Sequence, residues 1–191
     1  RGLDPAHFDV HVTCFANPGG TEGTFVEAAQ RHGLHVSTIP WGRRKPLFKA
    51  ARALAGLIRE YRVDIVHAHG WYADFVCAIA ARLVPIKTIT TAYVWFDYDW
   101  KRNLIQTIDQ YVIRGFDQIT AHCEHTRLAT VARGIPAARV KTLISGFATR
   151  RAELSREERQ TQRQARGVHD THVVLANVAR LYPEKAHDML L

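Results

Sequence analysis

Short runs in which apolar and polar residues alternate are separated along the chain by longer runs whose apolar residues recur every third or fourth position. The first pattern has the period of a β-strand, and the second has the period of an α-helix. Strands are predicted at residues 8–14, 34–39, 63–67, 86–91, 118–121, 140–144 and 172–178. Helices are predicted at residues 25–31, 47–61, 71–83, 103–114, 125–133 and 154–166.

This order of elements predicts an α/β fold in two parts. Strands that alternate with helices form right-handed crossovers, which give a parallel sheet with helices on both faces. We expect residues 1–147 to form a Rossmann-like, doubly wound parallel sheet. Residues 148–167 are polar and highly charged, which predicts a linker with a surface helix. The apolar run that follows predicts that residues 168–191 begin a second α/β domain.

The composition is that of an ordinary globular protein, with 47% apolar and 23% charged residues in a chain of 191. The longest uninterrupted apolar stretch, residues 75–81, is far shorter than the roughly 20 residues that cross a bilayer. Three widely spaced cysteines fit reduced thiols better than disulfides, so a cytoplasmic location is expected. The chain begins at Arg1 and ends inside an apolar run, so we expect it to be a fragment.

A basic segment, residues 43–62, contributes much of the net charge of +8. Its cations are Arg43, Arg44, Lys45, Lys49, Arg52, Arg59 and Arg62, against the single acid Glu60. Its helix either packs an apolar face and solvates its charges, or makes a peripheral contact with anionic lipid at the inner face of a membrane. A non-catalytic module that binds anions or nucleic acid is a further alternative. No helix-turn-helix, zinc-finger or RNA-binding signature is present, so nucleic acid is not the expected partner.

Parallel sheets bind ligands at the carboxyl ends of their strands, and several polar residues are expected there. His67 and His69 are two residues apart, so their side chains share one side of an extended segment. His69 can hydrogen-bond a substrate hydroxyl or act as a base, and a pair of structural histidines is the alternative. Residues 122–125 superficially resemble a metal cluster, but adjacent residues on one turn rarely complete a tetrahedral site. No metal is therefore expected, and Glu124 is interpreted as a residue of the strand mouth or a helix cap.

Two cations, Arg180 and Lys185, follow the last predicted strand. At the mouth of a parallel sheet they suit a diphosphate, and a helix that begins near Lys185 would add its positive end. The alternative is that both are surface charges. The aromatic segment 93–102 suits stacking on sugar rings, contact with a lipid interface, or packing back on the core. The glycine-rich segment 17–23 lacks the spacing of a phosphate-binding loop and is interpreted as a turn.

Taken in order, several segments resemble the family 4 glycosyltransferases, which have the two-domain GT-B fold. The most specific match covers residues 179–191, Ala-Arg-Leu-Tyr-Pro-Glu-Lys-Ala-His-Asp-Met-Leu-Leu. It is similar to the family's Gly-Arg-Leu-x-Pro-Glu-Lys-Gly-His-Asp-x-Leu-Leu. The other matching segments are 64–69 (Asp-Ile-Val-His-Ala-His), 123–127 (Cys-Glu-His-Thr-Arg), 134–136 (Gly-Ile-Pro) and 145–148 (Ser-Gly-Phe-Ala).

The resemblance implies transfer of a sugar from a nucleotide-sugar to a saccharide or lipid-linked acceptor, as in polysaccharide biosynthesis. Such hexosyltransferase-type reactions usually proceed with retention and without an essential metal or other cofactor. The resemblance assigns Arg180 and Lys185 to the donor diphosphate, His69 and Tyr93 to the catalytic centre, and two further cleft positions. Those positions are Glu124 and Gly146. Residues 1–147 would then be an acceptor-side GT-B domain that lacks its first strand.

The sequence also departs from the family pattern. Tyr93 stands where a histidine is common, and a tyrosine with an ordinary pKa near 10 is a poor base at neutral pH. Ser145 and Ala148 replace the asparagine and aspartate of an Asn-Gly-Ile-Asp turn. A second enzymatic interpretation is a GT-B sugar-nucleotide epimerase. Paired glutamates would favour a transferase over it, and they would follow Leu191. Because most of the donor pocket would also follow it, we expect the 191-residue chain alone to be inactive.

Overall fold

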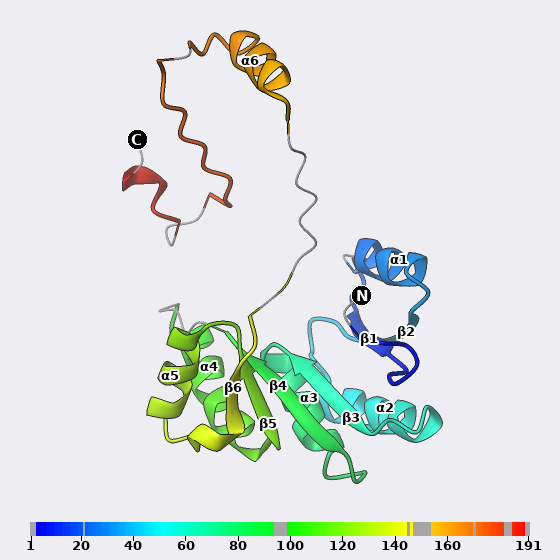
Figure 1. Cartoon of the computed structure of the whole chain (residues 1–191). Helices are drawn as coiled ribbons and strands as arrows, with labels where there is room; N and C mark the ends of the chain where they lie inside the picture. Colours follow the sequence, from blue (N-terminus) through cyan, green and yellow to red (C-terminus); the bar gives the residue numbers. More distant parts are fainter. Residues whose placement is uncertain are drawn as a thin grey trace. The chain divides into compact units, whose positions relative to one another are not determined.

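The computed structural model describes residues 3–20, 22–93, 99–144, 146, 154–169, 171–181 and 185–189. The chain divides into two compact units, Arg1–Gly146 and Phe147–Leu191 (Figure 1). This division falls next to the expected boundary at residue 147. The first unit contains all the strands of the described residues.

Strands and helices alternate through the first unit, as the hydrophobic pattern predicts. The strands are β1 His11–Ala16, β2 His35–Pro40, β3 Ile65–His69, β4 Lys87–Ala92, β5 Gln118–Ala121 and β6 Val140–Thr142. The helices are α1 Gly23–Arg31, α2 Leu47–Glu60, α3 Trp71–Ala80, α4 Trp100–Val112 and α5 Glu124–Ala132, with short 3-10 turns at Ile113–Gly115 and Ala137–Arg139. Every strand pair is parallel, which confirms the predicted α/β class.

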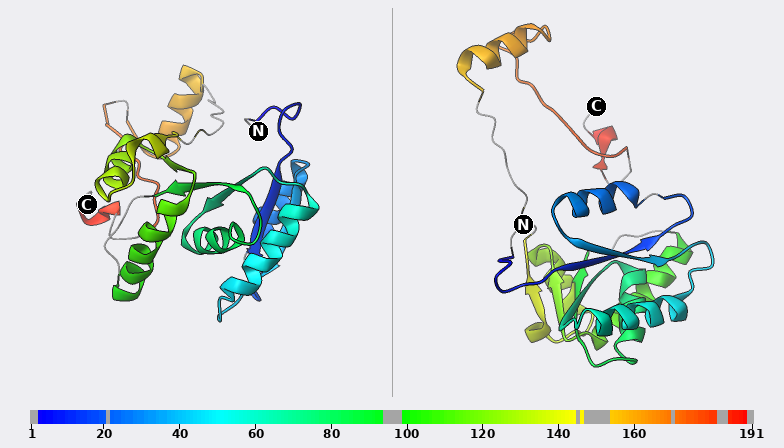
Figure 2. Two further views of the ribbon diagram at one scale, coloured as in Figure 1. Left: turned by 90° about the horizontal axis from the view of Figure 1, so that it is seen from below. Right: turned by 90° about the vertical axis from the view of Figure 1, so that its right-hand side faces the viewer.

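The strands form two sheets rather than the single sheet expected. β1 pairs with β2, and the other four strands follow the order β3-β4-β5-β6. Helices α1 and α2 lie on opposite sides of the β1–β2 pair, as two views agree (Figure 2). The smaller sheet therefore has the expected double covering.

The four-stranded sheet differs, because the described helices cover only one of its faces. On that face Ala68, Ala92, Ile119 and Val140 are buried in a cluster with Cys77 of α3. On the other face no strand residue is buried, and Ile65 is 53% exposed. Among the described residues, this sheet therefore has helices on one face only. Several residues of the open face favour water, whereas strands buried on both faces are almost continuously apolar. They include His67, His69, Lys87 and Gln118.

The basic helix α2 is amphipathic, as predicted. Ala50, Ala51, Ala55 and Ile58 are buried, and they form a second cluster with Val76 and other residues of α3. Small alanine side chains let α2 and α3 approach closely, and burial of apolar surface stabilises the pair by about 25 cal/mol per Å². All seven cations of the segment are exposed and remain hydrated: three lie on α2 (Lys49, Arg52 and Arg59) and four lie in the loops on either side of it.

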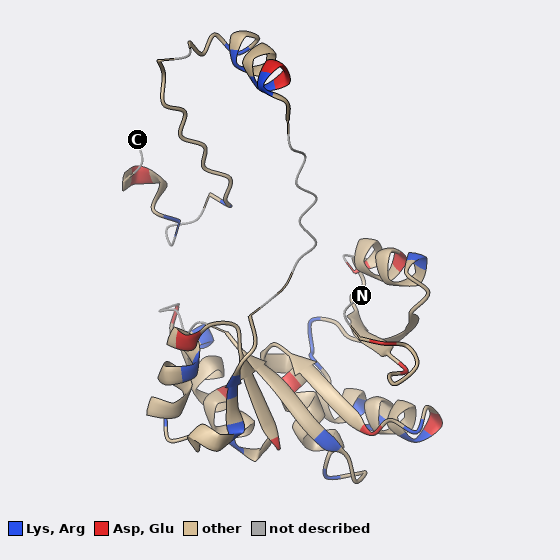
Figure 3. Cartoon of the chain, viewed as in Figure 1, with Lys and Arg blue, Asp and Glu red and all other residues tan. Residues whose placement is uncertain are grey.

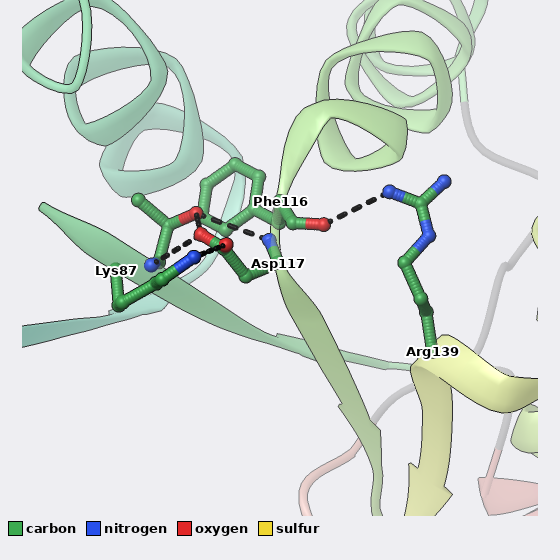
Figure 4. A network of polar contacts seen from close by, with 5 residues as sticks. Lys87, Phe116, Asp117 and Arg139 are labelled. Carbon is green, nitrogen blue, oxygen red and sulfur yellow. Dashed lines mark hydrogen bonds and ion pairs between the residues drawn. The ribbon is translucent and has the colours of Figure 1, made fainter.

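At the amino end of the four-stranded sheet, Asp117 joins the start of β4 to the start of β5 (Figure 4). Its carboxylate accepts from Lys87 Nζ at 2.7 Å, and from the Thr88 backbone N–H at 2.9 Å. The Thr88 hydroxyl completes the exchange, since it donates to Asp117 and accepts from the Asp117 N–H. At the same end of the sheet, the Arg139 guanidinium donates to the Phe116 carbonyl at 3.2 Å.

The second unit contains helix α6 at Arg156–Gln164, which confirms the predicted surface helix. Ser155 and Glu158 form a capping box that satisfies two backbone N–H groups at its start. The strand predicted at residues 172–178 is wrong, because this segment is extended without pairing. Val173 and Val178 are 87% and 98% exposed. A strand needs a neighbour for its backbone N–H and C=O groups, and the described part of this unit offers none.

In the part of the chain that the structure describes, no helix has both the length and the apolar character needed to cross a membrane.

Candidate functional site

The two histidines of β3 are brought together at the carboxyl end of the four-stranded sheet. His67 and His69 extend from the open face, and their ring centroids are 4.3 Å apart. Gly70 follows with a φ of 92°, a backbone conformation that glycine adopts without strain, and α3 begins at the next residue. This sharp turn ends β3 directly after His69. The prediction that both side chains share one side of the strand is confirmed.

A chain of hydrogen bonds joins His67 to Thr91 and Thr120. The Thr120 hydroxyl donates to the Thr90 carbonyl at 3.2 Å, so its oxygen accepts from the Thr91 hydroxyl at 2.9 Å. The Thr91 proton is then used, and Thr91 must accept from His67 Nε2–H at 2.8 Å. Each hydroxyl has a single proton, which sets the direction of the whole chain. This direction corresponds to the tautomer of His67 that has its proton on Nε2.

His69 is joined to the next strand through the residue that follows β4. Its Nδ1 lies 3.2 Å from the Tyr93 hydroxyl. Tyr93 also stacks on the His122 ring, with centroids 6.1 Å apart, and His122 Nδ1 lies 3.5 Å from the Ala92 carbonyl. Two catalytic candidates proposed from the sequence, His69 and Tyr93, are thus in direct contact. Because Nδ1 of His69 is engaged, Nε2 is the ring atom that remains for a substrate.

Both histidines of β3 favour the neutral form. Burial of the ring lowers the pKa of His69 below its ordinary value. Burial also lowers the pKa of His67, and the neighbouring His69 lowers it further because two positive rings would repel. At neutral pH the pair is therefore uncharged, and it can accept protons or hydrogen bonds from a substrate hydroxyl.

Glu124 lies in the first turn of α5 and is held by two partners. Arg127 donates from Nε to both carboxylate oxygens at 2.9 Å, and Thr142 of β6 donates its hydroxyl at 2.7 Å. The bonds from Arg127, and then the one from Thr142, lower the pKa of Glu124 to about 2. A carboxylate held this firmly in its charged form is unsuited to proton transfer at neutral pH. Through its bond to Thr142, Glu124 instead links α5 to β6.

A pair of buried carboxyl groups, Asp74 of α3 and Asp109 of α4, lies behind the same strand ends. Thr90 donates its hydroxyl to Asp74 at 2.6 Å. Burial, followed by the mutual proximity of the two acids, raises the pKa of Asp74 to about 8. Burial likewise raises the pKa of Asp109 to about 7. Asp109 Oδ1 is buried and has no hydrogen-bond partner among the described residues.

Sequence reasoning missed this acid pair. Both carboxyl groups line a small pocket of about 20 Å³ that also touches Gly70 and Tyr93. The available signal was Asp74 itself, a lone acid within the apolar run 71–83, since an unpaired charge is rarely buried.

The remaining site predictions fall in other parts of the chain. Arg180 and Lys185 are exposed and belong to the second unit. There His187 donates Nε2–H to the Arg180 carbonyl at 2.8 Å and accepts from Asn177 at 3.1 Å, which joins His187 to both residues. Gly146 is exposed at the end of the first unit.

Some predictions concern residues outside the described ranges. These are the aromatic residues 94–98, the turn residues 145 and 147–148, and residues 182–184 of the most specific motif. Among the described side chains, no group of three or more His, Cys, Asp or Glu residues could hold a metal ion.

Comparisons with known proteins place this geometry in context. Residues 1–146 match the family model described as the glycosyl transferase 4-like domain. A comparison with curated proteins finds no match.

Solved structures share the fold. Anabaena Alr3699/HepE in complex with UDP matches with a TM-score of 0.62 and 16% identity, over 82% of this chain and 50% of that one. The same protein in complex with UDP-glucose matches with a TM-score of 0.60 and 17% identity, over 82% and 50%. A glycosyltransferase from Rickettsia africae ESF-5 matches with a TM-score of 0.58 and 16% identity, over 84% and 51%. The chain thus spans about half the length of these neighbours.

Proposed function

Because the chain belongs to the glycosyl transferase 4-like domain family, we propose that it is the acceptor-side part of an enzyme that transfers a sugar from a nucleotide-sugar. The acceptor would be a saccharide or a lipid-linked saccharide. The observation that carries this proposal is the contact between His69 and Tyr93 at the carboxyl ends of adjacent parallel strands. This is the edge at which open α/β sheets bind their ligands.

The proposed chemistry breaks the bond between the anomeric carbon and the donor phosphate, so that the nucleoside diphosphate leaves. It forms a bond to an acceptor hydroxyl oxygen, whose proton passes to the departing diphosphate. We assign His69 Nε2 to a hydroxyl of the substrate, with Tyr93 holding the ring through Nδ1. The lowered pKa of His69 supports this role, since a neutral ring can accept a hydrogen bond at neutral pH. We propose retention and no essential metal, in line with the family resemblance.

Arg180 and Lys185 are proposed to bind the donor diphosphate. Cations stabilise a leaving diphosphate as its charge develops, and charge-assisted hydrogen bonds are the strong ones. The bond from His187 to the Arg180 carbonyl supports this assignment, because it holds the Arg180 backbone close to a residue that follows Lys185. The neighbour from Anabaena was solved with UDP and with UDP-glucose, which makes UDP-glucose a suitable probe.

We further propose that the 191-residue chain does not turn over donor by itself. In the described part of its second unit, the apolar side chains of residues 173–178 are exposed and no sheet forms. A donor pocket needs such apolar surface to be packed around the nucleotide. Transfer of a sugar by this chain alone would contradict the proposal.

The donor assignment is tested by equilibrium binding of UDP-glucose to the full-length protein. Arg180→Ala and Lys185→Ala should each raise the dissociation constant by roughly ten- to hundred-fold, about 1.4–3 kcal/mol. Arg159→Ala on the exposed surface of α6 is the matched control and should leave binding unchanged. Unchanged affinity in both test variants would remove these cations from the site.

A further inference from the structure

A shallow apolar groove of about 400 Å³ lies between α2 and the end of α3. It is lined by Phe48, Arg52, Ala78, Ile79, Arg82 and Leu83. Phe48 is 71% exposed and Leu83 is 45% exposed, so apolar surface that could be buried faces the solvent. Exposed apolar surface rimmed by polar groups is typical of an interaction site.

The rim of the groove is positively charged. Arg52 and Arg82 both line it and both are exposed. Arg59 reaches across from α2 and donates to the Leu83 carbonyl at 2.9 Å, which fixes the end of α3 beside α2. None of the acidic residues that the structure describes lines the groove. Figure 3 shows that basic residues also colour the loop that leads into α2.

The apolar lining and the two arginines of the groove together favour an anionic phospholipid over other classes of partner. Apolar walls favour a hydrocarbon, and two arginines at the rim favour phosphate, which guanidinium groups bind in a bidentate manner. A second copy of this chain is disfavoured, because each copy carries a net charge of +8 and would bring a similarly basic surface to the contact. An anionic phospholipid provides both the acyl chain and the phosphate in one partner.

We propose that this groove docks the protein on the surface of an anionic phospholipid membrane. Phe48 enters the boundary between headgroups and acyl chains, and Arg52 and Arg82 bind lipid phosphates. Aromatic side chains favour this boundary, and cations near an anionic leaflet add attraction. The contact is independent of sugar transfer, although it would hold the first unit beside a lipid-linked acceptor.

The test is co-sedimentation of the 191-residue chain with vesicles, without any nucleotide-sugar. Vesicles of phosphatidylcholine alone are compared with vesicles that also contain phosphatidylglycerol. We expect binding to the anionic vesicles that weakens as salt is added. Arg52→Gln together with Arg82→Gln should reduce the partition coefficient by roughly 30-fold, about fivefold for each cation. Phe48→Ala should reduce it by about tenfold, since its apolar surface is lost.

A matched control has the same change in net charge at a site outside the groove. Arg156→Gln together with Arg159→Gln on α6 should bind within about twofold of the unchanged chain, and circular dichroism checks that every variant is folded. An equal loss in this control would show binding by net charge alone and would overturn the proposal. Equal binding to pure phosphatidylcholine, absence of binding, or a dimer that Phe48→Ala dissociates would overturn it as well.

Discussion

The surroundings at the two ends of the four-stranded sheet favour different charge states of the polar side chains. At the amino end, Asp117 is held charged: the bond from Lys87, and then the bond from the Thr88 N–H, lower its pKa to about 2. At the carboxyl ends of β3 and β4, burial disfavours charge, because it raises the pKa of Asp74 and Asp109 and lowers the pKa of His67 and His69. Glu124, which follows β5, is the exception at this edge, since Arg127 and Thr142 hold it charged.

The two ends of the sheet also differ in how many of their polar atoms have hydrogen-bond partners. Asp117 exchanges hydrogen bonds with Thr88 in both directions, as Figure 4 shows. At the other end, Asp109 Oδ1 has no partner among the described residues, and the β3 histidines face the open side of the sheet. A fully bonded carboxylate stabilises the fold, whereas neutral and incompletely bonded groups remain able to react. We therefore interpret the amino end as structural and the carboxyl end as functional.

The largest expected change in stability lies at the amino end. Asp117→Ala should lower the free energy of unfolding by about 2 kcal/mol, because the buried Thr88 loses the partner of its N–H. The exposed ion pair with Lys87 contributes little of this. Urea unfolding followed by circular dichroism measures the change. Asp117→Asn keeps an oxygen for that N–H and should lose less. Equal midpoints for Asp117→Ala and the unchanged protein would contradict the structural interpretation.

A smaller and pH-dependent change is expected for the acid pair. The folded protein keeps protons on Asp74 and Asp109 up to about pH 7–8, whereas the unfolded chain loses them near pH 4. Folding thus takes up protons in this interval. The two protonated carboxyl groups therefore contribute their full stabilisation of the folded state below pH 4. This stabilisation is lost as the pH rises through their pKa values in the folded protein.

Asp109→Asn should weaken this dependence and stabilise the protein at pH 8 by about 1 kcal/mol, since an amide cannot ionise. Urea unfolding at pH 5 and at pH 8 provides the comparison. If the unchanged protein were equally stable at both pH values, the two carboxyl groups would not hold the proton that the structure assigns to them.

Removal of the Tyr93 hydroxyl should scarcely affect stability. Tyr93 is exposed, so Tyr93→Phe is expected to change the free energy of unfolding by less than about 0.5 kcal/mol. The same urea experiment measures it. A loss as large as that of Asp117→Ala would show that the contact between Tyr93 and His69 supports the fold rather than the site.

The smallest expected effect is a shift in a single titration. His69→Asn should raise the pKa of His67, because His69 no longer repels its positive form, while burial continues to lower it. NMR titration of the His67 ring measures the change. A pKa of His67 that does not move would mean that the two rings are electrostatically independent despite their 4.3 Å separation.

Sequence periodicity was sufficient for most of the elements in the first unit. The 47–61 run became α2, and the 118–121 run became β5, because each had a partner to pack against. The 172–178 run had a similar apolar pattern but formed no strand. An apolar pattern shows which side chains favour burial, but a strand also needs a neighbour, and a pattern along one segment carries no information about that neighbour.

The candidate site was predictable only in part. The period of two placed His67 and His69 on one side of β3, and the family resemblance brought in Tyr93. The contact between His69 and Tyr93 depends on the register of β3 and β4, in which His69 pairs with Thr91. The acid pair depends on the packing of α3 beside α4. Register and helix packing arise from the whole unit, so local patterns could not reveal either contact.

The central claim, that the carboxyl end of this sheet performs the chemistry, is tested most directly by turnover. The rate of UDP release from UDP-glucose is measured for the full-length protein, for His69→Asn and for Asp117→Asn, at a temperature where all three are folded. We predict that the rate of His69→Asn is lower than that of the unchanged protein by roughly a hundred- to ten-thousand-fold. The rate of Asp117→Asn should stay within about twofold of that of the unchanged protein. A rate for His69→Asn that equals that of the unchanged protein would contradict the account.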